Sequence, residues 1–258
     1  IIIEFRCMRL SDKRVPYMLK ILRKRRITII KKHLKKVERF IRLIAKVTGL
    51  WQLELLFVPF IHFRSSSFEP KVEERIRERL RNGWTFVDVG ASFGYYTVLA
   101  AIIMGPEGRV VSIEPAPKES YILSVMSKLY RLRNIFVMRV AAYSRNCRTK
   151  LYLSHLNGFH SLIKRNGGGF VSVRALTLDS ICSKLNVKGP IFIKVDVEGA
   201  EVEVIKGAEK ALSSMRPLCI VVEAHNQELR DEVVHRLKGF GFIPESLDIN
   251  HIYAEDGL

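Results

Sequence analysis

From residue 85 to residue 253 the chain alternates short apolar runs, rich in Val and Ile, with helical stretches of about ten residues. Parallel strands need a crossover connection of this length, so the pattern predicts a doubly wound α/β fold with a mostly parallel, seven-stranded sheet. The expected strands are residues 85–89, 109–113, 134–140, 191–195 and 218–222, with a final pair at 242–243 and 251–253; the expected helices are residues 95–104, 120–130, 178–185, 201–213 and 228–238.

Residues 148–176 depart from this alternation. Two short β-rich runs, 151–153 and 171–175, lie on either side of the glycine-rich segment Asn166–Gly169. Short strands around such a turn predict a small β-ribbon inserted into the α/β domain. We expect this ribbon to shape the pocket of the substrate that the domain binds.

The positive charge of the chain is concentrated at its N-terminus. The formal net charge is +17; residues 1–50 hold 16 Lys and Arg against three acids, whereas the other 208 residues hold 27 bases against 23 acids. Apolar residues recur every three or four positions from Ile27 to Ile44, which predicts a basic amphipathic helix over residues 18–48. We therefore expect a helical extension at 1–67 and a main domain at 68–258, which opens with a short helix over 69–82.

A turn with two glycines follows the first expected strand. The sequence Asp88-Val-Gly-Ala-Ser-Phe-Gly-Tyr-Tyr-Thr97 leaves an apolar strand and enters a helix, with Gly90 and Gly94 four residues apart. Glycine lets a ligand approach the backbone, and the amides that begin the next helix point toward that ligand. In an open α/β sheet, nucleotide-like ligands bind at this strand end. An ordinary strand-to-helix turn is the simpler alternative.

Glu114 ends the second expected strand, 24 residues after Gly90. A carboxylate at this position accepts hydrogen bonds from both hydroxyls of a ribose in nucleotide-binding α/β folds. The alternative is an exposed glutamate at a strand end. Turn and carboxylate together favour an adenosine-containing ligand. The third glycine of the dinucleotide motif is missing, which argues against a dinucleotide oxidoreductase.

Three acids follow the fourth long strand. In Lys194-Val-Asp-Val-Glu-Gly-Ala-Glu201, Asp196, Glu198 and Glu201 lie within six residues at the end of an apolar run. Carboxylates are costly to bury, so their concentration here indicates a polar site. Lys194, Asp196 and Glu198 share one side if the strand continues that far. Glu201 falls in the first turn of the next helix, where its charge also suits the helix dipole.

These segments, in this order, resemble the FkbM family of methyltransferases. The resemblance covers residues 68–245 and rests on Asp88–Thr97, Ile113-Glu-Pro115, Leu176-Thr-Leu-Asp179 and Lys194–Glu201, with Phe68-Glu-Pro70 and Ser161-Leu162 as further matches. It implies a Rossmann-like, S-adenosylmethionine-dependent methyltransferase, usually acting on a hydroxyl oxygen of a small molecule or sugar. The family usually has Asn where this chain has Ser92, so the contact made at that position differs.

The resemblance also implies which residues hold the cofactor and the acceptor. The expected S-adenosylmethionine site comprises Asp88, Gly90, Ala91, Ser92, Gly94, Tyr95, Glu114 and Asp196. The acceptor is expected beside Asp196, where correct positioning supplies much of the rate of an in-line methyl transfer.

An oxygen nucleophile also benefits from a general base, and the candidates are Asp196, Glu198, Glu223 and His225. Glu223 ends the fifth long strand on the same edge, and His225 follows it; a lone histidine there is more often structural. No metal is expected, although Asp196, Glu198 and Glu223 offer carboxylates that divalent cations prefer. His160, beside Ser161 in the ribbon, is a further candidate to reach the acceptor.

The basic segment leaves three kinds of partner open. It packs on the domain or on a second copy, it binds an anionic membrane surface that carries a lipid or lipid-linked sugar acceptor, or it binds RNA. RNA is less favoured, because no lysine lies near Glu223 and Phe40 is the one aromatic residue between Thr28 and Leu50.

The sequence also bears on location. The four cysteines show no metal-ligand spacing, no apolar run reaches the ~20 residues of a membrane span, and no secretory signal is evident. We expect a cytoplasmic protein, with peripheral contact to the inner face of the membrane as its second location. The acceptor and the oligomeric state stay open.

Overall fold

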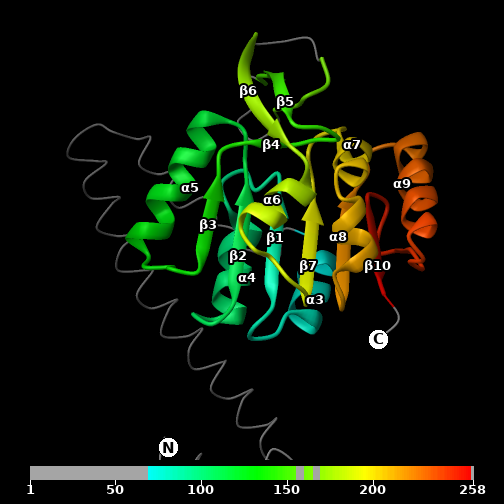
Figure 1. The fold of residues 1–258 in the computed structure, drawn as a ribbon, viewed down its shortest axis with the longest axis horizontal. Helices are drawn as coiled ribbons and strands as arrows, with labels where there is room; N and C mark the ends of the chain where they lie inside the picture. The colour runs from blue at the N-terminus through cyan, green and yellow to red at the C-terminus, as the bar shows by residue number, and fades with distance from the viewer. Residues whose placement is uncertain (1–68, 155–159, 165–168, 257–258) are drawn as a thin grey trace, which may run out of the picture. The chain divides into compact units, whose positions relative to one another are not determined.

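The structure is a computed structural model that describes residues 69–154, 160–164 and 169–256 (Figure 1). The predicted basic extension at 1–67 lies outside these residues, as does most of the glycine-rich segment Asn166–Gly169. No helix in the described part of the chain is long and apolar enough to cross a membrane.

A seven-stranded sheet forms the centre of the domain, in the order β3-β2-β1-β7-β8-β10-β9. Its strands are β1 (Thr85–Val89), β2 (Arg109–Ile113), β3 (Ile135–Met138), β7 (Ile191–Val195), β8 (Leu218–Glu223), β9 (Glu245–Ser246) and β10 (His251–Glu255). The strands from β3 to β8 run parallel, β10 runs antiparallel to β8, and β9 runs antiparallel to β10. The predicted doubly wound, mostly parallel α/β sheet is confirmed.

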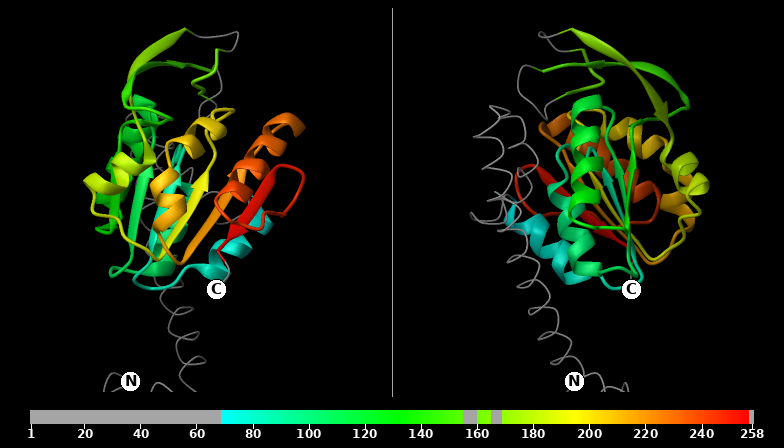
Figure 2. Two further views of the ribbon diagram at one scale, coloured as in Figure 1. Left: turned by 45° about the vertical axis from the view of Figure 1, so that its right-hand side comes forward. Right: turned by 90° about the vertical axis from the view of Figure 1, so that its left-hand side faces the viewer.

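Helices cover both faces of this sheet (Figures 1 and 2). Neighbouring side chains of β1 face opposite ways: Phe86 packs with α3 and α4, and Val87 packs in the core that α6 to α9 cover. Because both faces are covered, β1, β7 and β8 are buried along their whole length, which explains their apolar sequences. The helices are α3 (Pro70–Arg79), α4 (Tyr95–Met104), α5 (Pro117–Leu129), α6 (Leu178–Lys184), α7 (Glu201–Lys206), α8 (Glu209–Ser214) and α9 (Gln227–Gly239).

The strand order reverses between β1 and β7. The chain passes from β1 to β2 to β3 and then returns to β7 on the other side of β1. Connections therefore leave the carboxyl ends of β1 and β7 in opposite directions, which opens a crevice there. The glycine turn after β1 and the acids after β7 both lie at this crevice.

A second, three-stranded sheet lies above the carboxyl edge of the main sheet (Figure 1). It consists of β4 (Ala141–Ala142), β5 (Cys147–Tyr152) and β6 (Phe170–Leu176). The antiparallel pair of β5 and β6 is the predicted ribbon, and β4 adds a parallel strand that the sequence did not predict. Leu151, Val173 and Ala175 point inward and form a small core with Ala116 and Ala141.

The helix predicted over residues 201–213 is wrong as one element, because it is divided into α7 and α8. A side chain at Gly207 would lie 2.1 Å from the Tyr143 carbonyl oxygen, so the backbone comes close to the second sheet here. Asp179 from α6 accepts hydrogen bonds from the amides of Lys210 and Ala211, both at 2.9 Å. The carboxylate thus satisfies amides that begin a new helix.

The Asp179→Ala variant is expected to lose about 1–2 kcal/mol of unfolding free energy, because two amides at the start of α8 lose their acceptor. Urea denaturation measures this loss. Asp231→Ala, which removes an exposed aspartate from α9, is the matched control and is expected to change stability by less than about 0.5 kcal/mol. Equal losses in the two variants would contradict the assigned role of Asp179.

The final strand pair also differs from the prediction. Residues 242–243 form no strand; Phe242 is buried in the core while Ile243 is 85% exposed, and Glu245–Ser246 pairs with β10 instead. An apolar residue can enter the core from a loop, so burial of Phe242 did not require strand pairing. Smaller differences concern bounds: α5 begins at Pro117, and β3 ends at Met138.

The first helix of the domain is fastened to its last strands. Lys71 Nζ donates to the Leu247 carbonyl oxygen at 2.5 Å, and Arg79 lies 2.6 Å from Glu255. Arg75 forms a further ion pair of 2.7 Å with Glu245. Polar contacts therefore join α3 to β9, to β10 and to the loop between them.

Candidate functional site

The turn after β1 brings two strand ends into direct backbone contact. Gly90 has φ of 82°, and a Cβ atom there would lie 1.7 Å from the Asp196 carbonyl oxygen. The Asp196 amide donates to the Val89 carbonyl oxygen at 3.0 Å, which continues the contact between β1 and β7. Glycine is therefore required at position 90 both for its dihedral angle and for lack of space.

Asp88 lies beneath this turn. It is 1% exposed, and the Thr97 hydroxyl donates to it at 2.6 Å while lying 2.7 Å from the Ser112 hydroxyl. Burial raises the pKa of Asp88 above its usual value. The contacts fasten α4 to β1 and β2, so Asp88 supports the turn from below and is not part of the pocket lining.

Glu114 stands at the end of β2 with both carboxylate oxygens occupied. Oε2 accepts from the Ser92 amide and Oε1 from the Ala116 amide, each at 2.8 Å. Burial raises the pKa of Glu114 to about 7, although these two amides act in the opposite direction. The side chain is thus fixed in one orientation at the edge of the pocket.

The other turn residues contribute through the backbone. Ser92 has φ of 48°, a left-handed conformation that Asn tolerates better than Ser, which gives a physical reason for the usual Asn. The Ala91 amide donates to the Ile113 carbonyl oxygen, and Gly94 precedes α4 with φ of 86°. The Tyr95 hydroxyl donates to Glu73 at 2.7 Å, so its side chain turns toward α3 and its amide stays at the helix start.

Lys194 and Asp196 form an ion pair at the end of β7. The Lys194 ammonium is buried, 3.0 Å from Asp196 Oδ2 and 4.8 Å from the centre of the Tyr96 ring. Burial opposes both charges, but Lys194 holds the pKa of Asp196 below its usual value, and Asp196 with its acidic neighbours raises that of Lys194. Asp196 is therefore ionised at neutral pH.

Glu198 does not continue the strand, because β7 ends at Val195 and Glu198 itself has φ of 60°. The shared side expected for Lys194, Asp196 and Glu198 therefore holds for the first two. The Glu198 carbonyl oxygen accepts from the Ser161 hydroxyl at 2.7 Å. This hydrogen bond joins the ribbon segment to the loop after β7.

Glu201 has a supporting position. It is completely buried, and its Oε1 accepts from the amides of Val197 and Gly199 at 3.1 and 3.0 Å. Burial raises the pKa of Glu201 above its usual value. The side chain closes the loop that carries Glu198, so its contacts here are structural.

The four candidates for a general base come together in space. His225 Nε2 lies 3.7 Å from Glu198, and its Nδ1 lies 3.5 Å from Glu223. Asp196, Glu198 and His225 offer ligand atoms within 4.8 Å of one another. Asp196 and Glu198 line the pocket, whereas Glu223 and His225 stand behind them.

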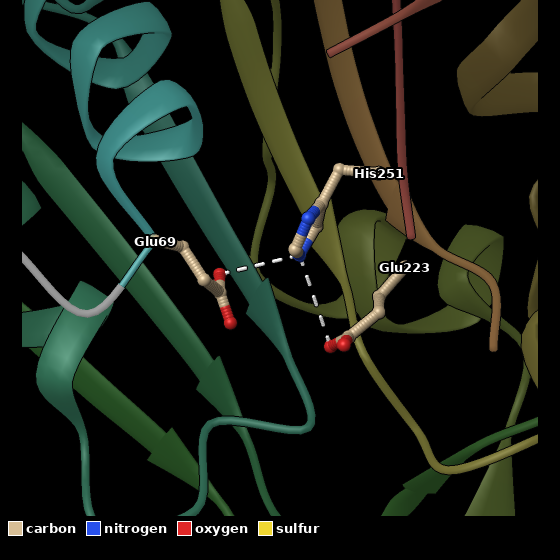
Figure 3. Close-up of side chains that lie close together, drawn as sticks. All are labelled: Glu69, Glu223 and His251. Atoms are coloured by element: carbon tan, nitrogen blue, oxygen red, sulfur yellow. Dashed lines mark ion pairs between the residues drawn. The ribbon is translucent and has the colours of Figure 1, made fainter. Parts of the chain in front are cut away.

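Two residues of this region were not predicted from the sequence. Glu69 and His251 meet Glu223 in a group of three side chains (Figure 3). His251 begins β10 directly opposite Glu223, and Glu69 lies just before α3. The segment Phe68-Glu-Pro70 belongs to the family resemblance, but nothing in its sequence indicates a partner near the other end of the domain.

One pocket connects the turn to the second sheet. Its lining comprises Gly90, Ile113, Glu114, Pro115, Ala141, Ala142, Leu151, His160, Leu162, Asp196, Val197 and Glu198. His160 Nδ1 accepts from the Ser154 amide at 3.0 Å, so its Nε2 carries the hydrogen and faces Glu119 at 3.2 Å. Since His160 lines this pocket, it can reach an acceptor bound there, as expected from the sequence.

Comparisons with known proteins agree with this geometry. A family model described as the methyltransferase FkbM domain matches residues 88–244. The chain belongs to the FkbM methyltransferase family. S-adenosylmethionine, which the resemblance implied, is the cofactor of this FkbM domain. The residues present fit this cofactor: Gly90 has no side chain that would keep a ligand away from the backbone, and the Glu114 carboxylate lies at the edge of the pocket.

One solved structure, an FkbM methyltransferase, shares the fold. Methyltransferase FkbM from Methylobacillus flagellatus KT has a TM-score of 0.51 and 20% identity, with 69% of this chain and 44% of that chain covered. A putative rRNA-methylase from Clostridium thermocellum has a TM-score of 0.49 and 13% identity, with 73% and 95% covered. The chain thus spans less than half of the Methylobacillus protein. No curated protein sequence matches the chain.

Proposed function

We propose that this FkbM domain methylates a hydroxyl oxygen of a small molecule, a sugar or a lipid-linked glycan. The observation that carries the proposal is one pocket whose lining includes Gly90 and Glu114 as well as Asp196 and Glu198. We assign Gly90 and Glu114 to a donor end that suits a nucleoside, and Asp196 and Glu198 to an acceptor end, beneath a roof that includes Leu151 and Leu162. A methyl donor held at the first end faces an acceptor at the second.

At the donor end the chain binds and orients. S-adenosylmethionine supplies an activated methyl group when it is bound. Glu114 accepts hydrogen bonds from the ribose hydroxyls, because each of its oxygens keeps a lone pair beside the amide it already accepts. Gly90 lets the ligand lie against the backbone. The hydrogen bond between Thr97 and Asp88 keeps the turn in place during this binding.

At the acceptor end the chain fixes the oxygen and accepts its proton. Asp196, kept ionised by Lys194, accepts a hydrogen bond from the acceptor hydroxyl and so holds its oxygen in line with the methyl group. Glu198, which also lines the pocket, is the proposed proton acceptor. Leu151 and Leu162 of the roof exclude water from the reacting atoms.

The test combines binding with transfer. Titration calorimetry of the full chain should show S-adenosylmethionine binding and no NAD binding, with the signal lost in Glu114→Ala. Transfer of a labelled methyl group to sugar and lipid-linked acceptors, followed by mild alkaline treatment, distinguishes ethers from esters. Asp196→Asn is expected to lower transfer about 100-fold while leaving cofactor affinity within about threefold. Preference for NAD, or alkali-labile methyl groups, would overturn the proposal.

Nucleoside binding is expected to tighten as the pH rises toward 7. With a pKa of about 7, Glu114 holds a proton at lower pH, and ribose hydroxyls favour its ionised form. Each pH unit below 7 should therefore weaken binding about tenfold. Calorimetry with methylthioadenosine, which lacks the titrating amino-acid group, measures this effect. Glu114→Gln should remove the slope, and a flat profile in the wild-type protein would refute the assignment.

The same shift affects stability without ligand. The pKa of Glu114 is raised from 4.5 to about 7 by folding, so between these values the folded protein holds a proton that the unfolded chain has released. The free energy of unfolding contributed by this group therefore falls as the pH rises from 4.5 to about 7. Above that range the contribution is constant.

The proposed partner is an anionic membrane surface, reached through residues 18–48 and through the second sheet. Between Glu119 and Asp179 the chain has ten Lys and Arg and no acid. Exposed Arg148 and Arg174 lie directly opposite each other in the pairing of β5 with β6, and like charges at such a position repel unless an anion is present. Phe170, 53% exposed, adds apolar surface.

Vesicle flotation tests this partner. The full chain should float with phosphatidylglycerol vesicles and remain unbound with phosphatidylcholine alone. The double variant Arg148→Glu/Arg174→Glu, and separately a chain without residues 1–48, should each lose most of the binding. Equal binding to both vesicle types would contradict the proposal. A higher affinity for RNA, seen as displacement of the protein from anionic vesicles by RNA, would favour RNA as the partner.

A further inference from the structure

Three side chains from distant segments of the chain lie close together (Figure 3). Glu69 lies just before α3, Glu223 ends β8, and His251 begins β10. Glu223 and His251 are paired residues of two antiparallel strands, so the sheet itself fixes their separation. The cluster adjoins the acids of the pocket: His225 Nδ1 lies 3.5 Å from Glu223, whereas Asp196 and Glu198 line the pocket itself.

The imidazole of His251 is aimed between the two carboxylates. Its Nε2 lies 3.3 Å from Glu69 Oε2 and 4.0 Å from Glu223 Oε2. His251 is 4% exposed, and this Nε2 is a buried atom without a hydrogen-bond partner in the described part of the chain. Its distance to Glu69 allows an ion pair, but the geometry is not that of a hydrogen bond. A buried polar atom left in this state needs a partner.

The opposite side of the ring is already fixed. Nδ1 lies 2.8 Å from Asp248 Oδ1, which also accepts from the amides of Asn250 and His251. A histidine that binds a metal almost always donates its other ring nitrogen to a carboxylate or carbonyl in this way. The arrangement sets the tautomer that presents a lone pair on Nε2 to the carboxylates.

The spacing suits a metal ion between the three groups. Ligand atoms that each lie ~2.1 Å from a metal are about 3.0–3.4 Å apart at octahedral or tetrahedral angles. The 3.3 Å separation falls in that range, and the 4.0 Å separation closes with a small side-chain movement. The ligand atoms of all three residues lie within 4.8 Å of one another.

Glu69 is also held in place, and both carboxylates are largely buried. The Tyr96 hydroxyl donates to Glu69 Oε2 at 2.6 Å, and the side chains of Glu69 and Glu223 are 13% and 11% exposed. Two carboxylates this close and this buried repel each other unless a cation lies nearby. Lys194 supplies one positive charge that acts on both carboxylates, and a second cation would balance the charge that remains.

We propose that Glu69, Glu223 and His251 bind a divalent transition-metal ion. One imidazole and two carboxylates suit Zn²⁺, Mn²⁺, Fe²⁺ or Co²⁺, whereas Mg²⁺ and Ca²⁺ prefer oxygen ligands alone. The ion joins the segment before α3 to the β8–β10 pair and so fastens the beginning of the domain to its end. The site does not depend on the proposed methylation, since it uses none of the pocket-lining residues.

Metal binding by the full chain tests the proposal. After chelator treatment and dialysis, titration calorimetry with Zn²⁺, Mn²⁺ and Co²⁺ should show one ion per chain and a rise in melting temperature, and Mg²⁺ should show neither. His251→Gln and Glu69→Gln are expected to weaken binding about 100-fold or more. Glu198→Gln, from the neighbouring cluster, is the matched control and should bind as the wild-type protein does.

Two further measurements keep the test decisive. The visible spectrum of Co²⁺ bound to the wild-type protein should show nitrogen and oxygen ligands. This measurement does not depend on whether a variant folds. Asp248→Asn, which keeps a side-chain oxygen, should lower affinity about 10–100-fold. If the wild-type protein binds no transition metal, the proposal is overturned, and a protonated His251 is what neutralises the carboxylates. Loss of binding in Glu198→Gln would show that the metal binds at a different site. Cofactor binding, measured separately, decides the proposed function independently.

Discussion

Gly90→Ala is expected to lower methyl transfer about 100-fold or more, because it displaces the strand end that carries Asp196. The added Cβ would lie 1.7 Å from the Asp196 carbonyl oxygen and 2.8 Å from its carbonyl carbon. Both atoms belong to the backbone, so no side-chain rotation relieves the contact. The end of β7 must shift relative to β1, and the pocket then loses the geometry that joins its two ends.

The matched control is Gly83→Ala. Gly83 has φ of 84°, close to the 82° of Gly90, but a Cβ atom there meets nothing within 4 Å. Both variants incur the cost of a left-handed residue, about 1–2 kcal/mol, and the clash is confined to Gly90→Ala. Cofactor affinity by calorimetry and melting temperature are measured for each. Similar losses in both variants would mean that the dihedral angle, and not the contact with Asp196, explains the requirement for glycine.

Lys194→Met is expected to lower the free energy of unfolding by about 3–5 kcal/mol. The ammonium is 3% exposed and 3.0 Å from Asp196, and Glu69, Asp88 and Glu223 also raise the pKa of Lys194 by their charge. Methionine fills a similar volume but leaves these buried acids without their shared cation. Some of these acids must then take up protons when the protein folds. The resulting loss of stability becomes larger as the pH rises.

Urea denaturation of Lys194→Met beside Lys188→Met measures this loss, since Lys188 is exposed just before β7. The control should differ from the wild-type protein by less than about 0.5 kcal/mol. Adding Asp196→Asn to Lys194→Met should restore part of the loss, because one uncompensated charge disappears. A loss below about 1 kcal/mol in Lys194→Met would show that solvent, and not this lysine, stabilises the acids.

Residues near one another in sequence account for what could be predicted. Gly90 and Glu114 belong to one strand–helix–strand unit, whose turn chemistry is local and follows from the residue types. Asp196 was recognisable because a carboxylate directly after a buried apolar strand is costly unless it belongs to a polar site. Contacts between residues of different strands could not be predicted in this way. Glu69, Glu223 and His251 lie together because the strand order places β10 beside β8.

The predictions that were wrong or incomplete also have physical causes. The apolar period of residues 201–213 fits one helix, and the break at Gly207 arises from a close approach of Tyr143 and a cap from Asp179, both distant in sequence. Charge summed over 208 residues concealed the acid-free stretch between Glu119 and Asp179, because acids elsewhere balance it. The role of Glu201 as acceptor for two loop amides needed the loop conformation itself.

The contacts between α3 and the last strands determine when the domain can be completed during synthesis. α3 is the first described helix to be made, but the partners of Lys71, Arg75 and Arg79 lie between Glu245 and Glu255 and are made last. α3 therefore waits for nearly the whole chain before it gains these three contacts. A protease that removed the last strand would also remove Glu255, the ion-pair partner of Arg79, so damage at one end of the domain weakens contacts at the other.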